Sequence, residues 1–142
     1  MKQATGRSGR VHVLRLQPGE DVRGVLQAWC VERAIEAAAV VSAVGSLSVA
    51  HIRYGGRADG MMTNGDLEVC ALSGTLSRHG AHLHLAVADR NGSMTGGHLL
   101  TGSIVRTTLE LVIQEVDGVR MIREKDPVTT YDELDPRPAD GP

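Results

Sequence analysis

The longest regular pattern in the sequence is the stretch 105–116, VRTTLELVIQEV, in which apolar and polar residues largely alternate. Because successive side chains of a β-strand point to opposite faces, this pattern predicts a long strand over residues 103–116. Other short apolar runs end at Gly, Pro, Asn or Asp, which is typical of strands joined by tight turns. These shorter strands are predicted over residues 11–16, 39–44, 47–54, 67–76, 81–88, 94–98 and 121–123.

One stretch has helical periodicity instead. Within residues 19–38, GEDVRGVLQAWCVERAIEAA, an apolar stripe runs at helical spacing from Val22 to Trp29. Glu20 and Asp21 stand at its start, where the helix dipole favours negative charge. Hairpin-length turns elsewhere favour antiparallel pairing. The predicted fold class is therefore α+β, a mainly antiparallel sheet of seven to eight strands with one main helix.

A length of 142 residues fits one domain. We place that domain at residues 10–134, with a flexible N-terminal arm at 1–9 and a disordered tail, rich in Pro and Asp, at 135–142. Aromatic residues make up 2% of the chain and Phe is absent, so the core must consist of aliphatic side chains and Met. A core without large aromatic side chains is thin, which favours packing in which apolar surface is also buried against other subunits.

The charge balance argues against strong binding to nucleic acids. The net charge is −2, and lysine occurs only at Lys2 and Lys125. A protein that depends on phosphate contacts usually has an excess or a stripe of basic residues. We therefore expect any binding of DNA by this chain to be weak.

The sequence also predicts a cytoplasmic protein. No apolar run approaches the roughly 18 residues that a membrane span needs, and the first residues lack the apolar stretch of a signal peptide. Cys30 and Cys70 are forty residues apart and form no metal-binding or redox motif, so we expect two buried free thiols in a reducing compartment.

The residues that point most directly to chemistry are three histidines. His82 and His84 flank Leu83 in a predicted strand, and His98 follows Gly96-Gly97 one hairpin later. Residues two apart in a strand face the same side with Cα atoms roughly 6.6 Å apart, so their imidazoles can converge on one metal ion. Three neutral imidazoles with an open fourth position are typical of a catalytic zinc site. The alternative is a cross-strand polar pair or an interface patch.

Two carboxylates are candidates for a catalytic or supporting role. Glu68 lies in a strand before the histidines and Glu110 lies in the long strand. Either could be a ligand, a partner of an imidazole or a general base, and either could equally be an ordinary exposed strand carboxylate. The glycine-rich stretch 55–66 has no phosphate-binding motif and is predicted to be a surface loop. Whether the protein is an enzyme stays open at this point.

Several of these segments together resemble the PPC domain, the "plants and prokaryotes conserved" family. The most specific are HLHLAVAD at 82–89 and GGHL at 96–99. The resemblance extends over about residues 10–134. Supporting segments are 14–21, 42–47, 68–76 and 108–113, with Arg123, Asp126, Tyr131, Glu133 and Leu134 near the end.

The resemblance implies a mainly antiparallel sheet with a helix, assembled as a homotrimer. Plant members carry a DNA-binding AT-hook before the domain, whereas prokaryotic members are usually the bare domain. This chain has no Arg-Gly-Arg-Pro core of an AT-hook and is similar to the bare form.

The fold also resembles part of acetolactate decarboxylase, a zinc enzyme with a similar HxH…H pattern, which implies His82, His84 and His98 as ligands. We therefore expect a cytoplasmic, trimeric protein that has a site for a metal ion or a small molecule and whose substrate is unknown. The alternative is a DNA-binding or transcription-related oligomerisation module.

Overall fold

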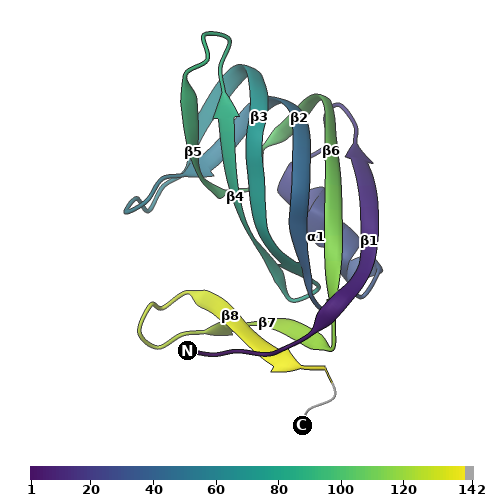
Figure 1. The fold of residues 1–142 in the computed structure, drawn as a ribbon. Helices are drawn as coiled ribbons and strands as arrows, with labels where there is room; N and C mark the ends of the chain where they lie inside the picture. Colours follow the sequence, from purple (N-terminus) through teal and green to yellow (C-terminus); the bar gives the residue numbers. More distant parts are fainter. Residues whose placement is uncertain (140–142) are drawn as a thin grey trace.

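The predicted fold class is confirmed in the computed structural model, which describes residues 1–139 (Figure 1). Eight strands and one short helix make up its regular structure. In chain order the elements are β1 (Arg7–Leu16), α1 (Val22–Glu32), β2 (Ala38–Arg53), β3 (Met61–Ser77), β4 (Gly80–Ala88), β5 (Met94–Leu99), β6 (Ile104–Asp117), β7 (Val119–Lys125) and β8 (Asp132–Pro138).

Six of the strands form one antiparallel sheet in the order β1-β6-β2-β3-β4-β5. The far end of β2 also pairs with β5, through Ile52 opposite Leu99 and Arg53 opposite His98. Strands β2, β3, β4 and β5 therefore close into a ring at that end of the sheet. Helix α1 lies behind the sheet, and β7 and β8 form a separate hairpin across one end of it (Figure 1).

The core is aliphatic, as the lack of Phe predicts. Helix α1 contributes Val22, Leu26 and Cys30, which are buried together with Leu, Val, Ile and Ala side chains of the sheet. The side chain of Asp21 caps the helix by accepting a hydrogen bond from the backbone N–H of Gly24. The cap fits the prediction that acidic residues stand at the helix start.

The helix is shorter than the predicted 19–38 because the chain turns sharply after Glu32. Ala34 has a φ of 52°, and the backbone N–H of Ile35 bonds to the carbonyl of Cys30. This left-handed turn lets Ile35 enter the core, where it is 4% exposed. The free energy gained by burying the Ile35 side chain thus outweighs the free energy of continuing the helix to residue 38, although most of these residues are good helix formers.

Gly45 does not form a turn, although the predicted strands 39–44 and 47–54 leave Gly45 and Ser46 as a turn between them. Strand β2 continues through it, paired with both β3 and β6. Gly45 has a φ of 156°, and a Cβ atom on it would lie 2.0 Å from the carbonyl oxygen of Thr108. The glycine is needed here for the close approach of two strands and not for a reversal of the chain.

Replacing Gly45 by Ala should therefore destabilise the protein by roughly 2–4 kcal/mol, because the added methyl group has to displace the backbone of β6. Gly92→Ala is the matched control, since Gly92 also has a positive φ (80°) but has nothing within 4 Å of its Cβ position. It should cost only about 1 kcal/mol. Urea unfolding at one fixed protein concentration measures both variants, and equal losses would contradict this role of Gly45.

The strands extend beyond the predicted domain of residues 10–134 at both ends. Strand β1 begins at Arg7, within the predicted flexible arm, and pairs there with β6. Strand β8 reaches Pro138, within the predicted tail 135–142, and pairs with β7. Residues 140–142 of that tail lie outside the described residues. Both extensions arise from strand pairing, which favours order even in polar segments.

Two further expectations need correction. Strand β3 begins at Met61, so the second half of the predicted loop 55–66 is paired with β2. Cys30 is buried as expected, but Cys70 is exposed on β3. Its position alternates with buried Val69 and so points away from the core. Within residues 1–139, no helix has the length and apolarity that crossing a membrane requires.

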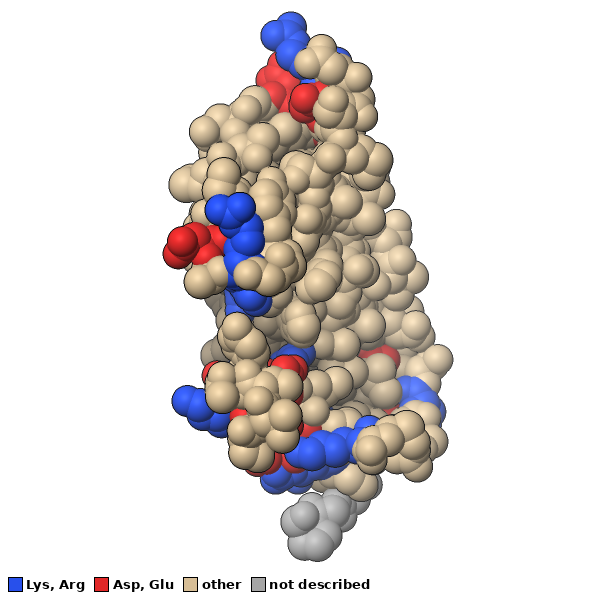
Figure 2. Space-filling model, turned by 90° about the vertical axis from the view of Figure 1, so that its left-hand side faces the viewer, with Lys and Arg blue, Asp and Glu red and all other residues tan. Residues whose placement is uncertain are grey.

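Charged side chains of both signs are interspersed on the face shown in Figure 2. They lie at the end of the molecule where the β7–β8 hairpin lies, at the opposite end, and along the left side at mid-height, and most of the remaining face carries neither lysine, arginine nor acidic residues. No continuous basic area is present on this side, in keeping with the net charge of −2.

Candidate metal centre

His82 and His84 lie on the outer face of β4, as their spacing predicts. The strand alternates strictly: Leu83 is 0% and Leu85 is 3% exposed, whereas both histidines are exposed. Burial of the two leucines thus determines the direction of the two imidazoles. The Nε2 atoms of His82 and His84 are 3.3 Å apart.

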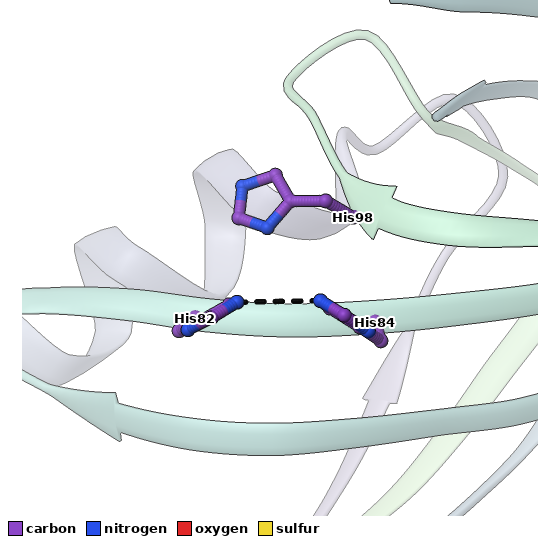
Figure 3. A group of neighbouring side chains, drawn as sticks. All are labelled: His82, His84 and His98. Atoms are coloured by element: carbon purple, nitrogen blue, oxygen red, sulfur yellow. Dashed lines mark hydrogen bonds between the residues drawn. The ribbon is translucent and has the colours of Figure 1, made fainter. Parts of the chain in front are cut away.

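His98 joins this pair from the neighbouring strand β5 (Figure 3). The β4–β5 register places His98 directly opposite His84, so the three side chains share one face. The ligating nitrogen atoms of the three histidines all lie within 4.8 Å of one another. The ring centroid of His98 is 5.0 Å from that of His82 and 5.8 Å from that of His84. The three histidines that the sequence singles out are therefore brought together.

The geometry of the cluster fits a single metal ion. Two nitrogens that each lie about 2.0–2.1 Å from a tetrahedral zinc ion are roughly 3.3 Å apart. The Nε2 atoms of His82 and His84 have this separation. Small rotations of the His98 ring would bring its nitrogen into the same range, since all pairs are already within 4.8 Å. Among the described residues, the ligating group consists of these three imidazoles.

The surroundings of His82 and His98 keep these two imidazoles neutral. Burial lowers the pKa of His98 to about 4, with further lowering by the nearby His82 and Arg53. Burial also lowers the pKa of His82, and Arg123 and His84 add to the effect. Both rings are therefore uncharged at neutral pH. A neutral imidazole has a free nitrogen lone pair, which is the form that binds a metal ion.

A cavity of about 320 Å³ adjoins the cluster. His82 and His98 form part of its wall, and the β7–β8 hairpin with the loop before β8 forms the opposite part. The charged and aromatic side chains that complete the lining are Arg23, Arg53, His79, Arg123, Tyr131, Asp132 and Glu133. We call this space the arginine cavity.

The two candidate carboxylates are not brought to the histidines. Glu68 on β3 pairs with Ala88 at the far end of β4, whereas His82 pairs with Thr75. Seven residues of strand separate these positions, which is roughly 23 Å. Glu110 lies on β6, which is separated from β4 by β2 and β3. Neither residue lines the arginine cavity.

The sequence did not identify the arginines of the cavity or Glu133 as site residues. Arg23, Arg53 and Arg123 come from α1, β2 and β7, which are far apart along the chain. No motif links them, because only the packing of the hairpin against the end of the sheet brings them together. Arg123, Tyr131 and Glu133 are named only as part of the family resemblance.

Comparison with known proteins agrees with this fold. The chain is 43% identical over 125 residues to the bifunctional protein GlmU of Synechococcus sp. (strain JA-3-3Ab). The match includes 88% of this chain but 20% of GlmU, so the chain spans about a fifth of the length of this curated relative.

Three solved structures are similar over nearly the whole chain. A hypothetical protein from Salmonella enterica has a TM-score of 0.91 and 39% identity, and the match covers 96% of this chain and 98% of that one. A metal-containing protein from Archaeoglobus fulgidus has a TM-score of 0.78 and 25% identity, with 94% and 99% covered. A protein from Ralstonia eutropha JMP134, named as a candidate DNA-binding protein, has a TM-score of 0.74 and 25% identity, with 94% and 93% covered.

The model of one protein family matches residues 3–117, which include all three histidines of the cluster. The cavity residues Arg123, Tyr131 and Glu133 follow after the matched segment. The match covers most of the chain and names the family that the HLHLAVAD and GGHL segments resemble: the chain belongs to the Plants and Prokaryotes Conserved (PCC) domain family.

Proposed function

We propose that the protein binds one divalent metal ion per subunit through His82, His84 and His98, and that the arginine cavity beside the ion receives a small-molecule ligand. The observation that carries the proposal is the convergence of three ligating nitrogens within 4.8 Å. Zinc is the proposed ion, because three neutral imidazoles with an open fourth position suit it. The metal-containing relative from Archaeoglobus fulgidus supports a metal in this fold.

The residues around the cluster have separate tasks in this proposal. When bound, zinc would supply Lewis acidity toward an oxygen atom of water or of a ligand. The guanidinium of Arg23 donates to the carbonyl oxygens of Ala81 and Leu99, the neighbours of His82 and His98, and so braces both ligand strands. Thr75 anchors Arg123 beside His82.

The carboxylates available to a ligand in the cavity are Asp132 and Glu133, in place of Glu68 and Glu110. Glu133 is oriented by a hydrogen bond from the hydroxyl of Thr129 at 3.0 Å. If the ligand is a substrate, these two groups are the ones positioned to accept or donate a proton.

Elemental analysis tests the metal proposal. Protein purified without a metal-affinity tag should contain close to one zinc ion per subunit, or should take up one ion per subunit when titrated with zinc. Uptake of well under one ion per subunit at saturating zinc would exclude the site. Calorimetry on metal-stripped protein provides both the stoichiometry and the affinity.

We further propose that the protein assembles as a homotrimer through the outer face of β1, β6 and β2. On this face Val13 pairs with Val112 and Val44 pairs with Glu110, while the alternate residues face the core. Val13 is 78% exposed and Val44 is 58% exposed. Val11 on β1 and Val41 on β2 are exposed as well. A group of exposed apolar side chains on neighbouring strands supports an interface at this part of the sheet.

A DNA-related role is the alternative function, and the similarity to the Ralstonia eutropha protein favours it. The net charge of −2 and the mixed charges in Figure 2 oppose it. We expect duplex DNA to bind weakly and without sequence preference, since few phosphates can be neutralised. Fluorescence anisotropy at physiological salt measures this, and submicromolar affinity for a defined site would favour the alternative.

A further inference from the structure

The arginine cavity concentrates positive charge beside the proposed metal centre. Each of its three arginines is half-buried and has a defined contact. Arg123 donates a hydrogen bond to Thr75 Oγ1 at 2.8 Å, and the guanidinium of Arg53 lies over the ring of Tyr131, 5.7 Å from its centroid. Arg23 donates to the carbonyl of Ala81 at 3.2 Å. None of these contacts neutralises the charge.

Within residues 1–139, none of these three guanidinium groups lies within 4 Å of a carboxylate oxygen, the limit for an ion pair. Other arginines of the same chain do form such pairs, for example Arg106 with Asp66 at 3.0 Å. The arginines of the cavity thus keep donors that no carboxylate of the described chain satisfies. A guanidinium group presents a planar fork of donors that matches a carboxylate or a phosphate group.

The charge of the lining also favours an anion. Three arginines face two carboxylates, Asp132 and Glu133, which leaves an excess of one positive charge when the histidines are neutral. A divalent ion at the histidines would raise this excess to three. The volume of about 320 Å³ lies at the lower end of the range for small-molecule sites, roughly 300–1,000 Å³, and so selects a small ligand.

We propose that the arginine cavity binds a small organic anion, whose carboxylate or phosphate group is held by Arg53 and Arg123 and whose other end lies against His82 and His98. The position of the ligand's other end, against His82 and His98, rests on the proposed metal centre. The binding of its anionic group rests on the arginines alone. The ligand class follows from the guanidinium groups that pair with no carboxylate and from the size of the cavity. A carboxylate and a phosphate group differ in shape and charge, so titration can distinguish them.

Calorimetric titration of the zinc-loaded protein with malonate and with inorganic phosphate tests the proposal, with uncharged malonamide as the control ligand. We expect one of the two anions to bind at one per subunit and malonamide not to bind. The anion that binds more tightly identifies the preferred group. Arg123→Gln and Arg53→Gln should each weaken that binding about tenfold or more, because each removes a charge-assisted hydrogen bond.

Arg90→Gln is the matched control, since Arg90 is exposed in the turn between β4 and β5 and does not line the cavity. It should leave anion binding unchanged. Arg53→Lys keeps the charge without the fork and should recover part of the affinity, which a merely destabilised variant would not do. Arg53 serves as the second variant should the loss of the Arg123 bond to Thr75 disturb folding.

The two proposals fail separately. Zinc binding of one ion per subunit with no binding of either anion at about 10 mM would overturn the anion site and leave the metal centre standing. Equal anion affinity in Arg53→Gln and Arg90→Gln would overturn it as well. If zinc does not bind, titration of the metal-free protein still measures the affinity of the arginine cavity for the anion. Anion binding that is lost in Arg53→Gln would then support the anion site without the metal centre.

Discussion

The double variant His82→Ala/His84→Ala should bind zinc at least about a hundredfold more weakly than the wild-type protein, because it retains one imidazole of three. Competition with a chromophoric chelator measures the affinity. His79→Ala is the matched control: His79 lines the same cavity but contacts Glu36 at 3.1 Å and does not belong to the ligating group. That variant should retain the wild-type affinity.

Thermal unfolding gives a second measure of the same site. Zinc should raise the melting temperature of the wild-type protein and of His79→Ala, since a ligand that binds the folded state stabilises it. It should leave the double variant unchanged. Because His82 and His84 are on the outer face of β4, removing them should not disturb the core, and circular dichroism verifies this. Wild-type zinc affinity in the double variant would place the ion elsewhere.

Static light scattering of the wild-type protein at micromolar concentration should give about 45 kDa, three times the subunit mass of 15.1 kDa. The double variant Val13→Asp/Val44→Asp should give a monomer, because it places two carboxylates in the proposed interface, where burial would desolvate them. The carboxylate at position 44 would also lie beside that of Glu110. Both valines are exposed within one subunit, so the substitutions leave the monomer's core intact.

Val128→Asp is the matched control for this prediction. Val128 is 87% exposed but lies between β7 and β8, away from the outer face of the sheet. It should leave the trimer unchanged. A wild-type protein that remains monomeric across the micromolar range would exclude the trimer, and a stable trimer in the double variant would place the interface on another face.

The sequence alone was sufficient for the fold class and for most of the strands. It did not predict β8, and it divided β2 into two strands. Alternation in the stretch 105–116 and turn residues between the shorter runs reflect local preferences of the backbone, which act wherever the chain is placed. The same period of two put His82 and His84 on one side of a strand. Local patterns gave a wrong prediction at Gly45, where β2 continues without a turn. Glycine is needed there because the strand lies close to the backbone of Thr108 on another strand.

The tertiary structure decided the rest of the site. The register of β4 against β5 puts His98 opposite His84, and a shift by one residue would have turned it to the other face. The arginine cavity depends on the packing of α1 and the β7–β8 hairpin against the sheet, which brings Arg23, Arg53 and Arg123 together. Contacts between residues this far apart follow from burial and pairing of the whole chain, which no short stretch of sequence encodes.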